Sequence, residues 1–234
     1  MKALVVLVVI VAVLLGIGLL ADRAVEKWAE GYVADQLTEQ AGLAGTPDVD
    51  VRGFPFLTQA LSGTYEDVRN SLTADELGQP EGTSADVRLV GVHIPLSAVL
   101  SGEVQEVPVD RIEGTATLSY ELLSAQLGGD STLSPEGDGL RVTKTVEILG
   151  YTLPLTASGT ISLDGDALVV DVEQASGAGV EVPGFLVDRA SDLLDLRYAV
   201  PALPFGLQLT SVTPAPDGVV VEVEATDTVL APLE

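Results

Sequence analysis

The sequence predicts an α+β domain in which a long, twisted antiparallel sheet carries an N-terminal helix and several short helices. Apolar residues recur three and four residues apart between Asp22 and Ala41, whereas from Val49 to the C-terminus most segments alternate as strands do. Turn sequences such as Asp164-Gly165-Asp166 and Pro216-Asp217-Gly218 separate neighbouring strands, which indicates hairpins and antiparallel pairing. The short helices are therefore expected on the apolar face of a sheet whose other face is wet.

Residues 1–21 stand apart from this domain. Lys2 is followed by nineteen apolar or Gly residues, from Ala3 to Ala21. As a helix this run is roughly 28 Å long, close to the thickness of about 30 Å of a hydrocarbon core. A cleaved signal peptide is the alternative, but cleavage after Ala21 would put Leu19 where a small residue is preferred. We therefore predict an uncleaved transmembrane signal-anchor over residues 1–21, with a single extracytoplasmic domain over residues 22–234 on the plasma membrane.

The segment from Asp22 to Ala41 predicts an amphipathic helix that ends at Gly42. Its apolar stripe consists of Val25, Trp28, Ala29, Tyr32, Val33 and Leu37. Two interpretations of this stripe stay open. The helix is either an ordinary core helix or one that lines the side of an apolar tunnel.

A short helix is predicted between two strands near residue 55. Pro55 suits its first turn, Gly63 its end, and the apolar positions between them are Phe56, Leu57, Ala60 and Leu61. A helix of about two turns is not stable alone, so this one must lie against a larger apolar surface. The flanking strands are predicted from alternation at Val49 and Val51 on one side, and at Val68, Leu72 and Ala74 on the other.

The remaining elements follow from the same periodicities. Strands are predicted over residues 85–94, 107–118, 140–149, 152–163, 167–174, 207–213 and 219–226, and helices over 95–100, 119–127 and 184–196. Residues 78–84 are predicted to form a loop.

The charge balance excludes whole classes of partner. With 35 Asp and Glu against 11 Lys and Arg, the formal net charge is −24, which opposes attraction to nucleic acid and to anionic membrane surfaces. Any lipid contact must therefore depend on apolar burial or on a tether. The absence of Cys removes disulfides, thiolate chemistry and a lipoprotein anchor.

No motif for catalysis or for a cofactor is present. The single His, His93, ends an apolar strand and is predicted to bond a backbone carbonyl rather than to act as a base. The acidic run Asp130–Asp138 and the Asp164–Asp166 turn are predicted to be solvated turns rather than calcium ligands. Asp188, Asp192 and Asp195 indicate the polar face of a helix rather than a catalytic pair. We therefore predict neither an enzyme, nor a cofactor, nor a metal site.

One stretch resembles a known family. Val51-Arg52 end a strand, Gly53-Phe54-Pro55-Phe56-Leu57-Thr58-Gln59 follow, and Leu61, Gly63, Tyr65 and Val68 continue the pattern. This stretch resembles the LmeA-type phospholipid-binding family of actinobacterial cell envelopes, and the resemblance extends over nearly the whole chain. It implies a tubular lipid-binding-like fold, phospholipid as the ligand, no catalysis, and a supporting role in building envelope lipoglycans.

The functional prediction combines these arguments. We expect a membrane-tethered extracytoplasmic phospholipid-binding protein that takes acyl chains between helices and sheet, with unknown protein partners. Its predicted lipid-binding residues are Trp28, Tyr32, Phe54, Phe56, Leu57, Leu61, Phe185, Leu186 and Phe205. A scaffold domain with a filled core, in which these residues are plain core, is the first alternative. A carboxylate-based envelope hydrolase is the second.

Overall fold

The chain forms two compact units in the computed structural model. Unit 1 comprises Met1–Ser71, Arg88–Ile112 and Thr226–Glu234, and unit 2 comprises Leu72–Val87 and Glu113–Ala225. The structure describes the backbone of residues 2–101, 104, 106–126, 131–137, 139–148, 151–165, 167–177, 180–181, 196–199 and 203–230. It describes the side chains of residues 16–39, 42–101, 104, 106–125, 131–137, 139–143, 156–165, 169, 174, 176, 203 and 205–230.

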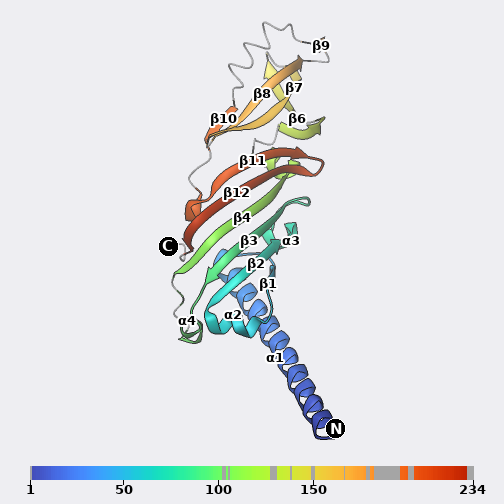
Figure 1. The fold of residues 1–234 in the computed structure, drawn as a ribbon. Coiled ribbons are helices and arrows are strands. Elements are labelled where there is room, and N and C mark those ends of the chain that lie inside the picture. The colour runs from blue at the N-terminus through green and yellow to red at the C-terminus, as the bar shows by residue number, and fades with distance from the viewer. Residues whose placement is uncertain are drawn as a thin grey trace. The chain divides into compact units, whose positions relative to one another are not determined.

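The strands belong to two sheets (Figure 1). The larger sheet has the order β1-β2-β3-β4-β12-β11, with β1 (Asp48–Arg52), β2 (Thr64–Leu72), β3 (Ser84–His93), β4 (Val107–Ser119), β11 (Gln208–Ala215) and β12 (Gly218–Leu230). The other has the order β10-β8-β7-β6-β5, with β5 (Ser131–Glu136), β6 (Gly139–Ile148), β7 (Tyr151–Asp164), β8 (Ala167–Gly177) and β10 (Leu196–Ala199), and β9 (Val180–Glu181) pairs with β8. The predicted α+β class with a large antiparallel sheet is confirmed, although the strands are divided between two sheets.

Unit 1 is organised around one long helix. α1 (Lys2–Ala41) runs without a break and ends at Gly42, whose φ of 64° is the left-handed conformation that glycine favours. It contacts β1 and α2 (Phe56–Ser62), and α2 contacts α4 (Leu96–Ser101). In Figure 1, α2 and α4 lie at the same end of the unit 1 strands, where α1 passes. The core of this unit contains Val51, Phe56 and Ala60, with Ala29, Tyr65 and Val68 packed against them.

Unit 2 has a separate core. Leu133, Leu140 and Val219 are buried there, and Tyr120, Leu123, Val142, Ile161, Val212 and Val221 pack around them. Tyr120 begins α5 (Tyr120–Gln126) and donates its phenolic hydrogen bond to the carbonyl oxygen of Ala215 at 2.7 Å. This bond connects α5 to the end of β11, so helix and hairpin share one core.

Two predicted segments are wrong. Ala74 does not continue the preceding strand but begins α3 (Ala74–Leu77), because Thr73 and Glu76 form a capping box and Gly78 ends the turn at a φ of 62°. Within the acidic run 130–138, residues 131–136 form β5 rather than a solvated turn, because Ser131 and Leu133 point inward on alternate positions. The predicted helix 184–196 lies outside the described residues, except that Leu196 begins β10.

The predicted membrane anchor falls in the first half of α1. Among the residues that the structure describes, no helix is both long and apolar enough to span a bilayer. The side chains of residues 1–15, on which most of that prediction depends, lie outside this described set.

Candidate functional site

The beginning of α2 is held by a carboxylate from α1. The backbone N–H of Phe56 donates to Oδ2 of Asp22 at 3.0 Å, and the N–H of Leu57 donates to Oδ1 at 2.7 Å. Pro55, which immediately precedes α2, offers no side-chain cap. Asp22 therefore satisfies two of the N–H groups that a helix start leaves unpaired, and its side chain is buried, with only 3% of the residue exposed.

The same face of α1 carries two further buried acids. Glu30 accepts the N–H of Val51 at 3.0 Å through Oε1 and the Lys27 ammonium at 2.7 Å through Oε2. The hydrogen bond and the charge of Glu30 raise the pKa of Lys27 above its ordinary value. Glu26 is paired with Arg23 at 2.6 Å. The packed face of α1 thus carries acids four residues apart. Through Glu30 it also accepts a backbone N–H of β1, which is an edge strand.

The packing around Gln59 explains several residues of the stretch from Gly53 to Val68. The buried Gln59 donates from Nε2 to the carbonyl of Arg52 at 3.3 Å and accepts the N–H of Glu66 at 2.9 Å, which bridges β1 and β2. Gly53 has a φ of 111°, and a Cβ there would lie 2.6 Å from Gln59 Nε2, so only glycine fits. Phe56 packs in the core with its ring 6.0 Å from that of Tyr65, whose pKa is raised by burial.

The end of α2 is connected to the beginning of α4. Gly63 has a φ of 71°, and its carbonyl accepts the N–H of Ile94 at 2.8 Å. A Cβ at Gly63 would lie 3.0 Å from the carbonyl oxygen of Ile94, so the two backbones approach closely. α2 and α4 are therefore held side by side.

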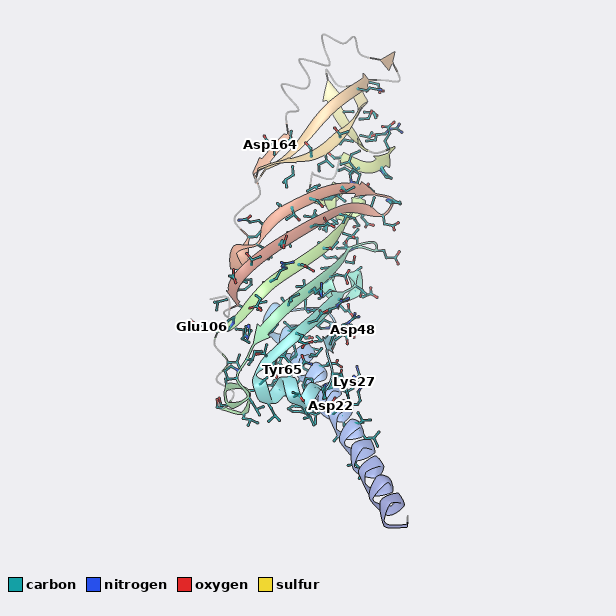
Figure 2. The ribbon with its side chains drawn as sticks, viewed as in Figure 1. Asp22, Lys27, Asp48, Tyr65, Glu106 and Asp164 are labelled. Atoms are coloured by element: carbon teal, nitrogen blue, oxygen red, sulfur yellow. The ribbon has the colours of Figure 1, made fainter. Side chains whose placement is uncertain are left out.

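The exposed sides of these two helices carry large apolar side chains among uncharged polar ones. We call this surface the apolar end of unit 1, and its exposed residues are Phe54, Leu57, Leu61, Val99 and Leu100. Leu61 is 76% exposed and Leu100 is 79% exposed. The Arg23 guanidinium lies 5.7 Å from the centre of the Phe54 ring, in cation–π contact. Figure 2 shows Asp22 and Lys27 on the stretch of α1 that passes α2, and Tyr65 beside α2.

The predicted apolar stripe of α1 faces outward. Trp28 is 67% exposed, Tyr32 is also exposed, and their rings stack with centroids 5.8 Å apart. Val25 and Val33 are exposed as well, whereas Ala29 packs against the unit 1 core. The core-helix interpretation is therefore wrong for Trp28 and Tyr32.

Six of the nine predicted lipid-binding residues lie in unit 1, in three different environments. Phe54, Leu57 and Leu61 share the apolar end, Trp28 and Tyr32 form a stacked pair, and Phe56 lies in the core. Phe205 is half-buried in unit 2, in the short turn Pro204–Gly206, and has a φ of 59°. Phe185 and Leu186 lie outside the described residues. Their shared role in lipid binding stays a prediction.

Sequence reasoning missed the buried acids of α1. The pattern was present, because Asp22, Glu26 and Glu30 recur every four residues. An inward acidic stripe is recognised only when the donors it meets are known, and these are backbone N–H groups of α2 and β1.

His93 forms a surface contact in place of the predicted bond to a carbonyl. Its Nε2 lies 3.0 Å from Oδ1 of Asp110, and its Nδ1 lies 3.4 Å from the hydroxyl of Thr64. These three residue types suit a nucleophile, a base and an orienting acid, but a catalytic acid of this kind is buried and the side chain of Asp110 is 64% exposed. The arrangement indicates a cross-strand pair rather than an active site.

Charged groups elsewhere in unit 1 form ordinary ion pairs. Asp67 lies between Arg69 and Arg88, each 3.1 Å away, and the hydrogen bond from Arg69 is the main reason that the pKa of Asp67 is lowered. No group of three or more His, Asp or Glu side chains suited to a metal ion occurs among the residues described.

Comparison with known proteins identifies a family. The model of a family described as LmeA-like phospholipid-binding matches residues 20–224. No curated protein and no solved structure matches the chain. The match includes α1 from Leu20 onward, the whole apolar end and both sheets, and it ends at Glu224 within β12.

Proposed function

Because the chain belongs to the LmeA-like phospholipid-binding family, we propose that it is a membrane-tethered, extracytoplasmic protein that binds phospholipid through apolar contacts and supports construction of envelope lipoglycans. The family match over residues 20–224 carries this proposal. The family is a lipid-binding family rather than an enzyme family.

Charge and exposure support apolar recognition of the lipid. A net charge of −24 repels an anionic headgroup, so affinity must come from burying acyl chains, at about 25 cal/mol per Å² of apolar surface. Phe54, Leu57 and Leu61 offer such surface on a helix that is fixed from behind. Trp28 and Tyr32 offer it on α1.

Phospholipid binding is tested by native mass spectrometry of the full chain, released from nanodiscs that contain several phospholipid classes. We expect a stoichiometric phospholipid adduct, whose mass identifies the headgroup. The double variant Leu57→Ser and Leu61→Ser should lose much of the adduct. Thr58→Ser, at an exposed position of the same helix, should keep it. A chain that is released without lipid from every mixture would favour the scaffold alternative.

Tether and location need a separate test, for which the absence of Cys is convenient. Asp48 is exposed on β1, so Asp48→Cys introduces a single thiol into the domain. In intact cells that express the full chain, a membrane-impermeant maleimide should label this thiol, and alkaline carbonate should leave the chain in the membrane fraction. Labelling that requires permeabilised cells would contradict the extracytoplasmic location.

A further inference from the structure

We propose that the apolar end of unit 1 rests in the interface of the same phospholipid bilayer into which residues 3–21 run, so that the domain contacts its membrane at two places. This inference rests on the proposed tether. The apolar end contacts one leaflet of that bilayer through the side chains of Phe54, Leu57, Leu61, Val99 and Leu100.

The exposed side chains belong to a rigidly held surface. Asp22 caps α2, Gln59 bonds to both flanking strands, and Phe56 anchors the helix in the core. The Gly63–Ile94 hydrogen bond then fixes α4 beside α2. Large apolar side chains held in water on two neighbouring helices are costly, and exposed apolar surface of this kind is typical of an interaction site.

This surface is also free of charge, although the chain as a whole is strongly acidic. Residues 53–63 and 94–102 contain no Asp, Glu, Lys or Arg, although Asp and Glu number 35 in the whole sequence. An acidic protein meets least repulsion from anionic headgroups where it carries no carboxylate. The apolar end is therefore the part of unit 1 best suited to approach a bilayer.

The position of α2 along α1 decides how close the apolar end lies to the bilayer surface. Asp22 is the first charged residue after the apolar run, so it marks the end of the proposed membrane segment. Its carboxylate lies 2.7 Å from the N–H of Leu57, which places the start of α2 at that same level. α1 is unbroken from Lys2 to Ala41. No flexible linker therefore separates Asp22, which holds α2, from the segment that is proposed to enter the membrane.

Cationic side chains lie next to the same boundary. The side chains of Arg23 and Lys27 are 61% and 76% exposed, each on an acid of α1, and Arg23 covers the Phe54 ring. Long cationic side chains at the end of a membrane segment extend toward phosphate groups. Their charge complements the phosphates of a headgroup layer, and the net charge of −24 opposes the approach of a second copy of this chain.

The experiment uses the full chain in nanodiscs of phosphatidylcholine and phosphatidylglycerol. Single-cysteine variants Leu61→Cys and Leu100→Cys carry an environment-sensitive fluorophore, and Asp48→Cys is the control on β1. Lipids with a nitroxide high on the acyl chain should reduce emission at positions 61 and 100 by about twofold or more and leave position 48 unchanged. The emission at positions 61 and 100 should also shift to the blue.

Each other outcome overturns the proposal in a recognisable way. If the chain elutes with the discs while labels at 61 and 100 respond to aqueous iodide as strongly as the label at 48, the tether stands and the second contact is absent. If those labels are protected from iodide but not quenched by nitroxide lipid, a second copy covers the surface instead. If the chain does not elute with the discs, the tether itself fails, and the inference fails with it.

Discussion

The carboxylate of Asp22 accepts the N–H of Leu57 at 2.7 Å, so the first acidic residue of the chain serves as the helix cap of a segment 35 residues further on. Phe56 donates to the same carboxylate. This single side chain joins α1 to α2 and decides where the apolar end lies relative to the N-terminal helix.

Removing this cap should loosen α2. We expect Asp22→Ala to lower local stability by about 1–2 kcal/mol, because two backbone N–H groups lose their acceptor in a buried place. Hydrogen exchange of the full chain should show faster exchange at Phe56 and Leu57. Asp35→Ala, which removes an exposed acid from the same helix, should leave α2 unchanged. Equal exchange in the two variants would contradict the capping role.

Alanine substitutions at Gly42 and Gly63 distinguish the cost of a positive φ from the cost of a close backbone contact. Both have positive φ, but a Cβ at Gly42 meets nothing within 4 Å, whereas at Gly63 it meets the Ile94 carbonyl at 3.0 Å. Gly42→Ala should cost about 1 kcal/mol from the left-handed conformation alone. Gly63→Ala should cost more and should also speed exchange of the Ile94 amide. Similar losses of unfolding free energy at the two positions would show that the Gly63–Ile94 approach is not limiting.

Alanine substitutions at Phe56 and Leu61 should distinguish a residue that stabilises the fold from one that is free to contact the membrane. Phe56 is 3% exposed, so Phe56→Ala should lower the unfolding free energy by about 3–5 kcal/mol. Leu61→Ala should change it by less than about 0.5 kcal/mol, because that side chain packs against little. Denaturant unfolding of the full chain in detergent measures both. A large loss at Leu61 would mean that it is a core residue in solution.

Acid should weaken the Asp67 cluster. The pKa of Asp67 is held below its ordinary value of about 3.9 by Arg69 and then by Arg88, so the ionised carboxylate favours the folded state. This contribution is complete above the ordinary pKa and is lost as pH falls through the lower native pKa. Carboxyl NMR should show Arg69→Gln raising the pKa of Asp67. Arg52→Gln, whose partner is Asp50, should leave it unchanged.

Much of the fold was predictable because the periodicities are local. The change from helical to strand spacing after α1, the α2 segment ending at Gly63, and the β11–β12 hairpin each follow from neighbouring residues. β5 was missed because its charged and polar positions resemble a turn until β6 is known to pair with it. Division into two sheets depends on pairing between distant segments, which periodicity does not encode.

The candidate site was predictable in composition but not in orientation. Phe54, Leu57 and Leu61 were selected as apolar residues, yet their exposure depends on Asp22, Gln59 and Phe56 fixing the opposite side of α2. On α1 the sequence leaves open whether the apolar stripe lies in the core or lines an apolar tunnel. The backbone donors of α2 and β1 instead require acceptors, and this requirement turns Trp28 and Tyr32 outward.

The unbroken course of α1 gives the proposed tether a mechanical property. A helix that continues from Lys2 to Ala41 transmits any change of its tilt directly to unit 1, because α2 and β1 are bonded to its side chains. Tilt of a membrane helix follows the thickness of the surrounding hydrocarbon. Under the proposed anchoring, a thinner bilayer would lean the helix further and rotate the apolar end against the lipid, so that membrane composition would control how the domain engages its ligand.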